Sequence, residues 1–323
     1  MSPRFWFRVA VIALGLAASS PRPSAADEFP GRPITFVVAF AAGGYADSVA
    51  RIIGARLAER IGQNVVIENR GGAGGNIAGA AVAHAAPDGY TLLVTTSSVA
   101  VNDAYYKNKV FSVSDLKAIA IAGGAPETLS VKPDHPAKTL ADLIASAKGR
   151  SIDYASAGVG TSSHVAAAYF FKEFAKIDTV HVPFQGGAPS INAVMGGHVE
   201  VLVGTLPGYA SQFHSGAMRP LAIASETRLP EFPDVPTYAD AGYPGFSAET
   251  WIGVFAPARV DDAIAIKLNK EINELIREPA IEAKLKTLSF QTHQRDLATA
   301  DEYFRSQVAD WAKRVKAVGV FAE

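Results

Sequence analysis

The chain has 323 residues, of which 49% are hydrophobic, and its 30 Lys and Arg residues nearly balance its 31 Asp and Glu residues. This length and apolar content suit one large domain or two smaller ones, each with a packed core, and exclude a disordered protein. Cysteine is absent, which excludes disulfides, thiolate metal sites, a cysteine nucleophile and a lipidated cysteine. The mixed charge gives no indication of a nucleic acid or an anionic membrane as partner.

Residues 1–26 have the pattern of a secretory signal peptide. Arg4 and Arg8 precede an apolar run from Val9 to Ala18, which is about half as long as a membrane-spanning helix requires. The small residues at 24–26 predict cleavage before Asp27, which would place the mature chain in the periplasm. Cleavage would remove three arginines and change the formal charge from −1 to −4.

The segment after the leader alternates predicted strands and helices. Strands are expected at 34–40, 65–68 and 90–95, with helices following Asp47 and at 77–85. The strands are followed by clusters of glycine or hydroxyl residues at 41–47, 69–76 and 95–98. Such alternation indicates a parallel α/β sheet, in which ligands bind beyond the carboxyl ends of the strands.

A crossing into a second α/β lobe is predicted near Gly123. Strands are expected at 116–122, 129–132, 180–183, 199–203, 221–224 and 251–256, with helices at 139–147, 261–277, 279–287 and 299–318. The strand at 251–256 would return to the first lobe. The first lobe is therefore assigned to 27–123 plus 250–323 and the second to 124–249, an arrangement that can close on a ligand.

The stretch from Tyr154 to Phe171 runs from a strand through a glycine loop into a helix. Gly158 and Gly160 would let the backbone approach a ligand closely, and the hydroxyls at 161–163 lie where the first amide hydrogens of the helix lack partners. Such a turn can bind an anion. The alternative is an ordinary turn with a Ser/Thr cap.

Other readings of the same residues are weaker. Ser163 stands where a dinucleotide loop needs its third glycine, and no phosphate-loop lysine pattern exists. Ser162 and Ser163 do not face their neighbour His164 on a helix, and no G-x-S-x-G motif is present. The other histidines lack metal-ligand spacing, and Asp47 is expected to cap its helix. We therefore expect no metal or cofactor, with an exported enzyme acting on a small carboxylate as the alternative function.

Several motifs in chain order resemble the Bug family, the periplasmic receptors of tripartite tricarboxylate transporters. They are A-F-A-A-G-G-Y-A-D (39–47), V-V-I-E-N-R-G-G-A-G-G-N-I (65–77), A-A-P-D-G-Y-T-L-L (85–93), Y-A-S-A-G-V-G-T-S-S-H (154–164), H-V-P-F-Q-G-G-A-P (181–189) and W-A-K (311–313). The resemblance covers nearly the whole mature chain. It implies a type II-like Venus-flytrap fold that binds a small carboxylate in a cleft between the lobes without catalysis. It also implies transporter membrane components as partners, and we expect a monomer.

Carried over position by position, the resemblance assigns residues of five segments to the ligand: Phe40, Ala42, Gly43, Gly44, Tyr45, Asp47, Thr96, Ser97, Ser156, Gly158, Gly160, Thr161, Ser162, Ser163, His164, Gln185, Gly186, Gly204 and Thr205. The chain departs from the family at Ala41-Ala42, where prolines are common, and at Gly204-Thr205, where an Asp-Asn pair often lies. Because glycine at 204 lacks charge and volume, we expect the site to prefer dicarboxylates, aliphatic or aromatic, to amino acids.

Overall fold

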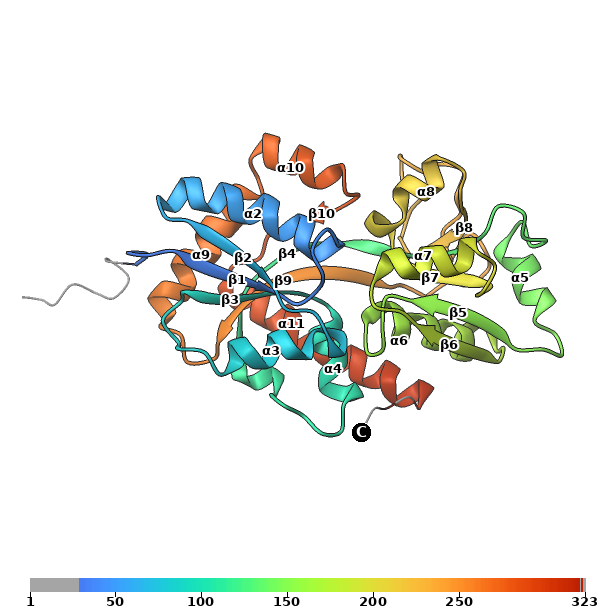
Figure 1. Cartoon of the computed structure of the whole chain (residues 1–323), viewed down its shortest axis with the longest axis horizontal. Coiled ribbons are helices and arrows are strands. Elements are labelled where there is room, and N and C mark those ends of the chain that lie inside the picture. The colour runs from blue at the N-terminus through green and yellow to red at the C-terminus, as the bar shows by residue number, and fades with distance from the viewer. Residues whose placement is uncertain (1–28, 320, 322–323) are drawn as a thin grey trace, which may run out of the picture.

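The computed structural model describes residues 29–319 and 321, so the predicted leader at 1–26 lies outside the described residues. Figure 1 shows two groups of helices and strands side by side, joined in the middle by the long strands β4 and β9. The strands are β1 (Ile34–Val38), β2 (Val65–Asn69), β3 (Thr91–Thr96), β4 (Leu116–Val131), β5 (Ile152–Ser156), β6 (Thr179–Pro183), β7 (Val201–Thr205), β8 (Arg219–Ile223), β9 (Glu249–Pro257) and β10 (Gln291–Thr292).

The helices cover the sheet in both groups (Figure 1). They are α2 (Tyr45–Ile61), α3 (Asn76–Ala83), α4 (Ser98–Tyr105), α5 (Leu140–Ser146), α6 (Ser162–Tyr169), α7 (Gly187–Met195), α8 (Ala210–His214), α9 (Asp262–Leu275), α10 (Pro279–Lys286) and α11 (Leu297–Val318). Within the described ranges, none of them combines the length and apolarity needed to cross a membrane.

Both faces of β1 are covered, as its unbroken apolar sequence predicts. Phe36 and Val38 pack with buried side chains of α2 and α9 on one face, whereas Val37 packs with the cluster that includes Trp311 of α11 on the other. α2 ends where Gly62 adopts a left-handed conformation, which glycine reaches without steric cost. The helix periodicity and the apolar run therefore predicted these elements correctly.

The sheet is mixed, whereas the strand–helix alternation predicts a parallel one. Its strand order is β2-β1-β3-β9-β4-β7-β5-β6, with β8 and β10 both pairing with β4. β1 pairs in parallel with β2 and β3, but β9 is antiparallel to both β3 and β4. β4 and β9 connect the two groups in opposite directions and pair along most of that path, which a purely parallel sheet would not allow.

β4 is one strand of 16 residues, so the prediction of two separate strands at 116–122 and 129–132 is wrong. The strand pairs with β9 along its first part and with β7 from Glu127 onward. A β-carbon on Gly123 would lie 2.0 Å from the carbonyl oxygen of Gln291 in β10, and the register with β9 shifts beside this glycine. The glycine therefore permits a bulge and a close strand approach without ending the strand. The lobe boundaries stay a prediction.

Candidate functional site

The loop between β1 and α2 is held in shape by Asp47, whose carboxyl is fully engaged within the protein. One oxygen accepts from the Gly43 amide (2.8 Å) and from Arg51 Nε (2.9 Å), and the other accepts from Asn69 Nδ2 (2.9 Å), which also donates to the Phe40 carbonyl (3.0 Å). Burial acts to raise the pKa of Asp47, but these hydrogen bonds outweigh it and the pKa is lowered. The carboxyl therefore caps the Gly43 amide just before α2, whereas the N-cap residue of the helix, Gly44, provides no side-chain cap.

The loop between β5 and α6 uses most of its own hydroxyls. Thr161 is the N-cap of α6: its Oγ1 accepts from the His164 amide (3.3 Å) and donates to the Gly158 carbonyl (2.8 Å). Ser156 Oγ lies 2.7 Å from His181 Nε2 and accepts from the Gly158 amide (3.3 Å). The turn therefore has the Ser/Thr cap that the alternative interpretation predicts. Hydrogen bonds within the protein hold the loop without a ligand.

The glycines of this loop allow close contact with α4 and with the loop between β2 and α3. Gly160 has a φ of +72°, and a β-carbon there would lie 2.8 Å from Asn102 Oδ1 of α4. A β-carbon on Gly74 would lie 3.0 Å from the Val159 carbonyl oxygen. Asn102 Nδ2 also donates to the Gly74 carbonyl (2.8 Å). These glycines therefore bring the two loops together, as close backbone approach requires.

Hydroxyl groups from both lobes form one connected network at this junction. The Ser162 amide donates to Ser98 Oγ (3.1 Å), which also accepts from Thr96 Oγ1 (2.8 Å). Ser162 Oγ lies 2.8 Å from Thr250 Oγ1, and the Tyr45 hydroxyl donates to the Thr250 carbonyl (3.2 Å). The structure thus joins the segments around 45, 96 and 162, which the resemblance assigns to one site.

One further assigned segment, 185–186, and the remaining residues of the segment around Tyr45 lie beside this network. The Gly186 amide donates to the Ala157 carbonyl (3.1 Å), which attaches the loop before α7 to the loop before α6. The side chain of Gln185 is exposed, as are Ala42 and Gly43, so these three are at the edge of the junction. Gly44 and Phe40 are partly buried.

Ser97 is fully buried at the start of α4. Its amide donates to the Trp251 carbonyl (3.0 Å), but its Oγ has no hydrogen-bond partner among the described residues. Buried hydroxyls without a partner are rare because they lose their hydrogen bonds to water. This assigned residue therefore offers a donor that the protein itself does not use.

Gly204 does not leave an empty space in the site, although glycine has no side chain. A β-carbon there would lie 2.1 Å from the Tyr209 ring, so the ring fills this space. The charge is not removed from the region either, because Thr205 Oγ1 donates to the buried carboxyl of Glu127 (3.2 Å). The reasoning that glycine at 204 leaves this position without volume or charge is therefore wrong.

The residues assigned to the ligand do not include Glu127, Thr250 or Ser98, although Ser98 belongs to the hydroxyl cluster at 95–98. Glu127 is a charged residue inside an otherwise uncharged stretch of strand, A-P-E-T-L-S-V, which is a signal that could have indicated it. Ser98 belongs to α4, a helix that was not predicted. Thr250 carries no local signal, since a threonine at the start of a strand is ordinary.

Ser162 and Ser163, at the start of α6, have no hydrogen bond to His164 among the described contacts, and the serine that does contact a histidine is Ser156, beside His181. Ser163 Oγ donates to Glu127 (2.9 and 3.0 Å), and His164 Nδ1 accepts from the Gly160 amide (3.3 Å). His164 stacks on His181 at 3.8 Å between ring centroids, and burial lowers the pKa of His164 to about 4. Groups of three or more side chains placed to hold a metal are also absent from the described ranges.

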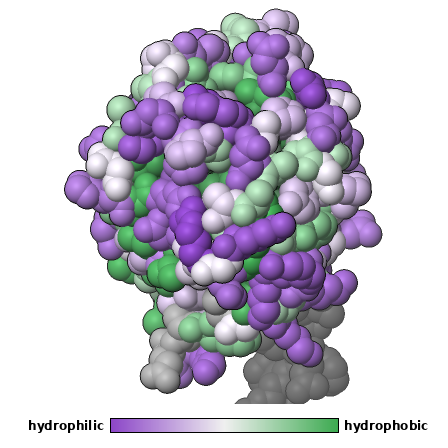
Figure 2. Space-filling model, turned by 90° about the vertical axis from the view of Figure 1, so that its right-hand side faces the viewer, coloured by the Kyte–Doolittle hydropathy of each residue, from purple (hydrophilic) through white to green (hydrophobic). Residues whose placement is uncertain are grey.

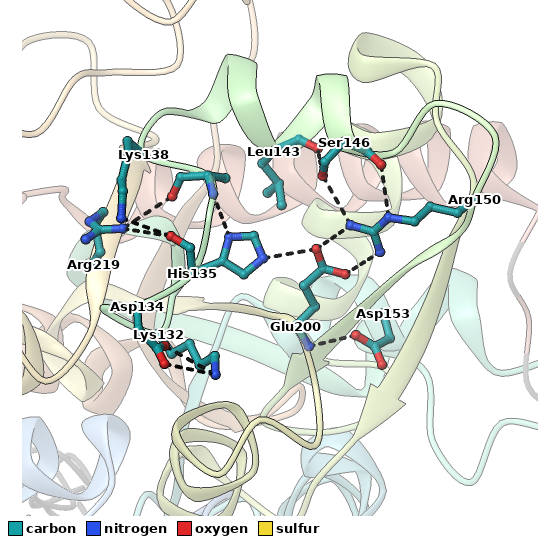
Figure 3. A network of polar contacts seen from close by, with 11 residues as sticks. Lys132, Asp134, His135, Lys138, Leu143, Ser146, Arg150, Asp153, Glu200 and Arg219 are labelled. Atoms are coloured by element: carbon teal, nitrogen blue, oxygen red, sulfur yellow. Dashed lines mark hydrogen bonds and ion pairs between the residues drawn. The ribbon is translucent and has the colours of Figure 1, made fainter.

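A separate polar cluster surrounds Glu200 (Figure 3), in the group of elements that contains α5, β5 and β6 (Figure 1). Glu200 binds Arg150 in a bidentate pair (2.6 Å for both bonds) and lies 3.1 Å from His135 Nε2, while its amide donates to Asp153 (2.7 Å). The cluster connects β5, β7 and the segment after β4. Figure 2 shows the side of the molecule that is on the right in Figure 1, with hydrophilic residues interspersed among hydrophobic ones. The cluster supports these elements and lies apart from the hydroxyl network.

The chain is similar to known proteins in both sequence and structure. The family described as "Tripartite tricarboxylate transporter family receptor" matches residues 49–320. Protein BugT of Bordetella pertussis is 34% identical over 321 residues, which cover 96% of this chain and 97% of the relative. A solved R. palustris structure with adipate has a TM-score of 0.85 at 30% identity and covers 91% of this chain and 99% of its own. MatC from Rhodopseudomonas palustris with bound malate has a TM-score of 0.83 at 31% identity, covering 89% and 100%.

The match extends along nearly all of the described chain and includes both lobes. The predicted α/β fold of a two-lobed periplasmic binding protein is therefore confirmed, and so is the resemblance stated from the motifs. The chain belongs to the tripartite tricarboxylate transporter receptor family, which includes the Bug proteins.

Proposed function

We propose that this protein is a periplasmic solute-binding protein that captures a small dicarboxylate, aliphatic or aromatic, and delivers it to the membrane components of a tripartite tricarboxylate transporter. The observation that carries the proposal is the junction where hydroxyls of both lobes meet beside Ser97, whose buried Oγ is unused. Hydroxyl and amide donors at a helix start suit a carboxylate. The adipate and malate bound by two relatives support the same ligand class.

The proposal includes the location and the arrangement of the chain. A leader at 1–26 would direct export, so that the mature protein begins at Asp27 and acts as a monomer. The first lobe would comprise 27–123 plus 250–323 and the second 124–249, with β4 and β9 as the crossings. The change of partner along β4, from β9 to β7 at Glu127, supports a division close to this position.

A thermal-shift panel tests the proposal directly. Adipate, malate, an aromatic diacid and glutamate are added to the purified mature protein, and the bound ligand is recovered and identified by mass spectrometry. A binding protein gains thermal stability and returns the ligand chemically unchanged. Turnover of the ligand would instead favour an exported enzyme acting on a small carboxylate.

A matched pair of variants tests the role of Ser97. Ser97→Ala should weaken the binding of a stabilising diacid by about 1 kcal/mol, which is the usual net contribution of one hydrogen bond. Ser130 of β4 is also fully buried with an unpartnered Oγ, but it is not assigned to the ligand. Ser130→Ala should therefore leave affinity unchanged, and equal effects of the two substitutions would contradict the assignment.

A further inference from the structure

Glu127 lies at the centre of the hydroxyl network, with only 1% of the residue exposed. Ser163 Oγ donates to both of its oxygens (3.0 and 2.9 Å), Thr205 Oγ1 donates to Oε1 (3.2 Å), and Thr250 Oγ1 donates to the same oxygen. These donors come from α6, β7 and β9. A single buried carboxyl therefore connects three elements that meet at the junction.

The charge of Glu127 is not balanced by a basic group in the described part of the chain. Burial raises the pKa of Glu127 to about 7, and the hydrogen bonds from the three hydroxyls offset only part of this rise. The titratable groups that the charge of Glu127 affects are Tyr45, Tyr209 and Tyr238. Glu249 also acts on Tyr45, and the basic group next to it, His293, contacts Glu249 (3.3 Å). Burial and the charge of Glu127 both raise the pKa of the three tyrosines, which therefore stay protonated.

The position of Glu127 conflicts with a fully ionised diacid as ligand. Ser163 and Thr205 are both assigned to the ligand, yet both of their hydroxyls already donate hydrogen bonds to Glu127. A ligand carboxylate at this point would compete for these donors and would place a second negative charge against the first. Like charges that share a buried site disfavour each other, and one of the two groups then takes up a proton.

We propose that Glu127 determines the specificity of the site by holding the second carboxyl group of a dicarboxylic acid through one shared proton. This inference rests on the proposed function and adds a condition to it. The diacid binds together with one proton from the solvent, and no covalent bond changes. A monocarboxylate leaves Glu127 with its hydroxyl partners and binds without a proton.

Calorimetry in two buffers of different ionisation enthalpy tests this on the wild-type protein, with adipate and malate as probes. At about pH 8 both acids are fully ionised in water, so binding should take up close to one proton per diacid. The dissociation constant should then rise by up to about tenfold per pH unit above neutrality. Hexanoate, which lacks the second carboxyl group, should bind without proton uptake.

Variants separate Glu127 from other groups. Glu127→Gln keeps the shape and should abolish the proton uptake and the pH dependence, while binding the ionised diacids more tightly than the wild type at about pH 8. Glu249→Gln is the matched control, since Glu249 lies on β9 opposite Pro126, the neighbour of Glu127 in β4, but has a side chain that is 35% exposed. This control should retain the proton uptake.

The possible failures are distinguishable. Diacid binding by the wild type without proton uptake, or uptake that persists in Glu127→Gln, would overturn the role of Glu127 and leave the proposed function intact. The wild-type result needs no variant, so a folding defect in Glu127→Gln would not obscure it. If neither protein binds either diacid at any pH, the proposed function fails and the role of Glu127 fails with it.

Discussion

Replacing Glu127 with glutamine should change how the stability of the ligand-free protein depends on pH. Burial raises the pKa of the Glu127 carboxyl from 4.5 to about 7, so the folded protein keeps a proton that the unfolded chain releases between these values. The unfolded state then binds fewer protons, and the stability of the wild type falls as the pH rises through this window. At about 1.4 kcal/mol per pKa unit, the loss amounts to roughly 3 kcal/mol.

Urea unfolding at about pH 5 and about pH 8 measures this loss in both proteins. Glutamine carries no charge, so the variant should become more stable relative to the wild type by roughly 3 kcal/mol on going from the lower to the higher pH. All other titrating groups are common to both proteins and cancel in the comparison. If the pH profiles of the two proteins are parallel, then the hydrogen bonds of Glu127 do offset the cost of burying its charge, and the prediction is refuted.

Glu249→Gln is the control for a carboxyl that solvent can reach. Its side chain is 35% exposed, so water screens its charge and the same replacement should change the free energy of unfolding by less than about 1 kcal/mol at either pH. A change as large as that of Glu127→Gln would mean that the effect reflects the general charge of this region. The structure would then not single out Glu127.

Three further substitutions give separate outcomes. Gly160→Ala should lower stability by about 1 to 3 kcal/mol in thermal unfolding, because its φ is +72° and its β-carbon would meet a buried amide oxygen; Gly149→Ala, at a φ of +80° with open space around it, should cost less. Asp47→Asn should lose about 1 kcal/mol at neutral pH, and the loss should disappear as the pH falls through the lowered pKa of Asp47. Ser163→Ala removes a donor that lowers the pKa of Glu127, so the decline in stability should extend to higher pH in the urea series; an unchanged midpoint would contradict this.

The sequence by itself determined most of the helices and strands and the family. Apolar runs such as Ile34–Phe40 and the stripe of Val49, Ile53 and Leu57 are local patterns, and the burial of one face or both follows from them without knowledge of distant contacts. The motif around Thr161 likewise indicated both a helix start and a ligand-binding loop. Thr161 is the cap, and that loop lies at the junction of the lobes.

Only the tertiary structure decided which hydrogen-bond partners the buried polar groups of these loops have. The carboxyl of Glu127 meets Ser163, Thr205 and Thr250 across separations of 36, 78 and 123 residues. These contacts depend on the register of β4 with β7 and β9, which no local pattern specifies. For the same reason the glycine at 204 suggested open space, whereas the Tyr209 ring fills it. Sequence patterns report which face of an element is buried, but the partner that a buried polar group finds depends on which strands lie side by side.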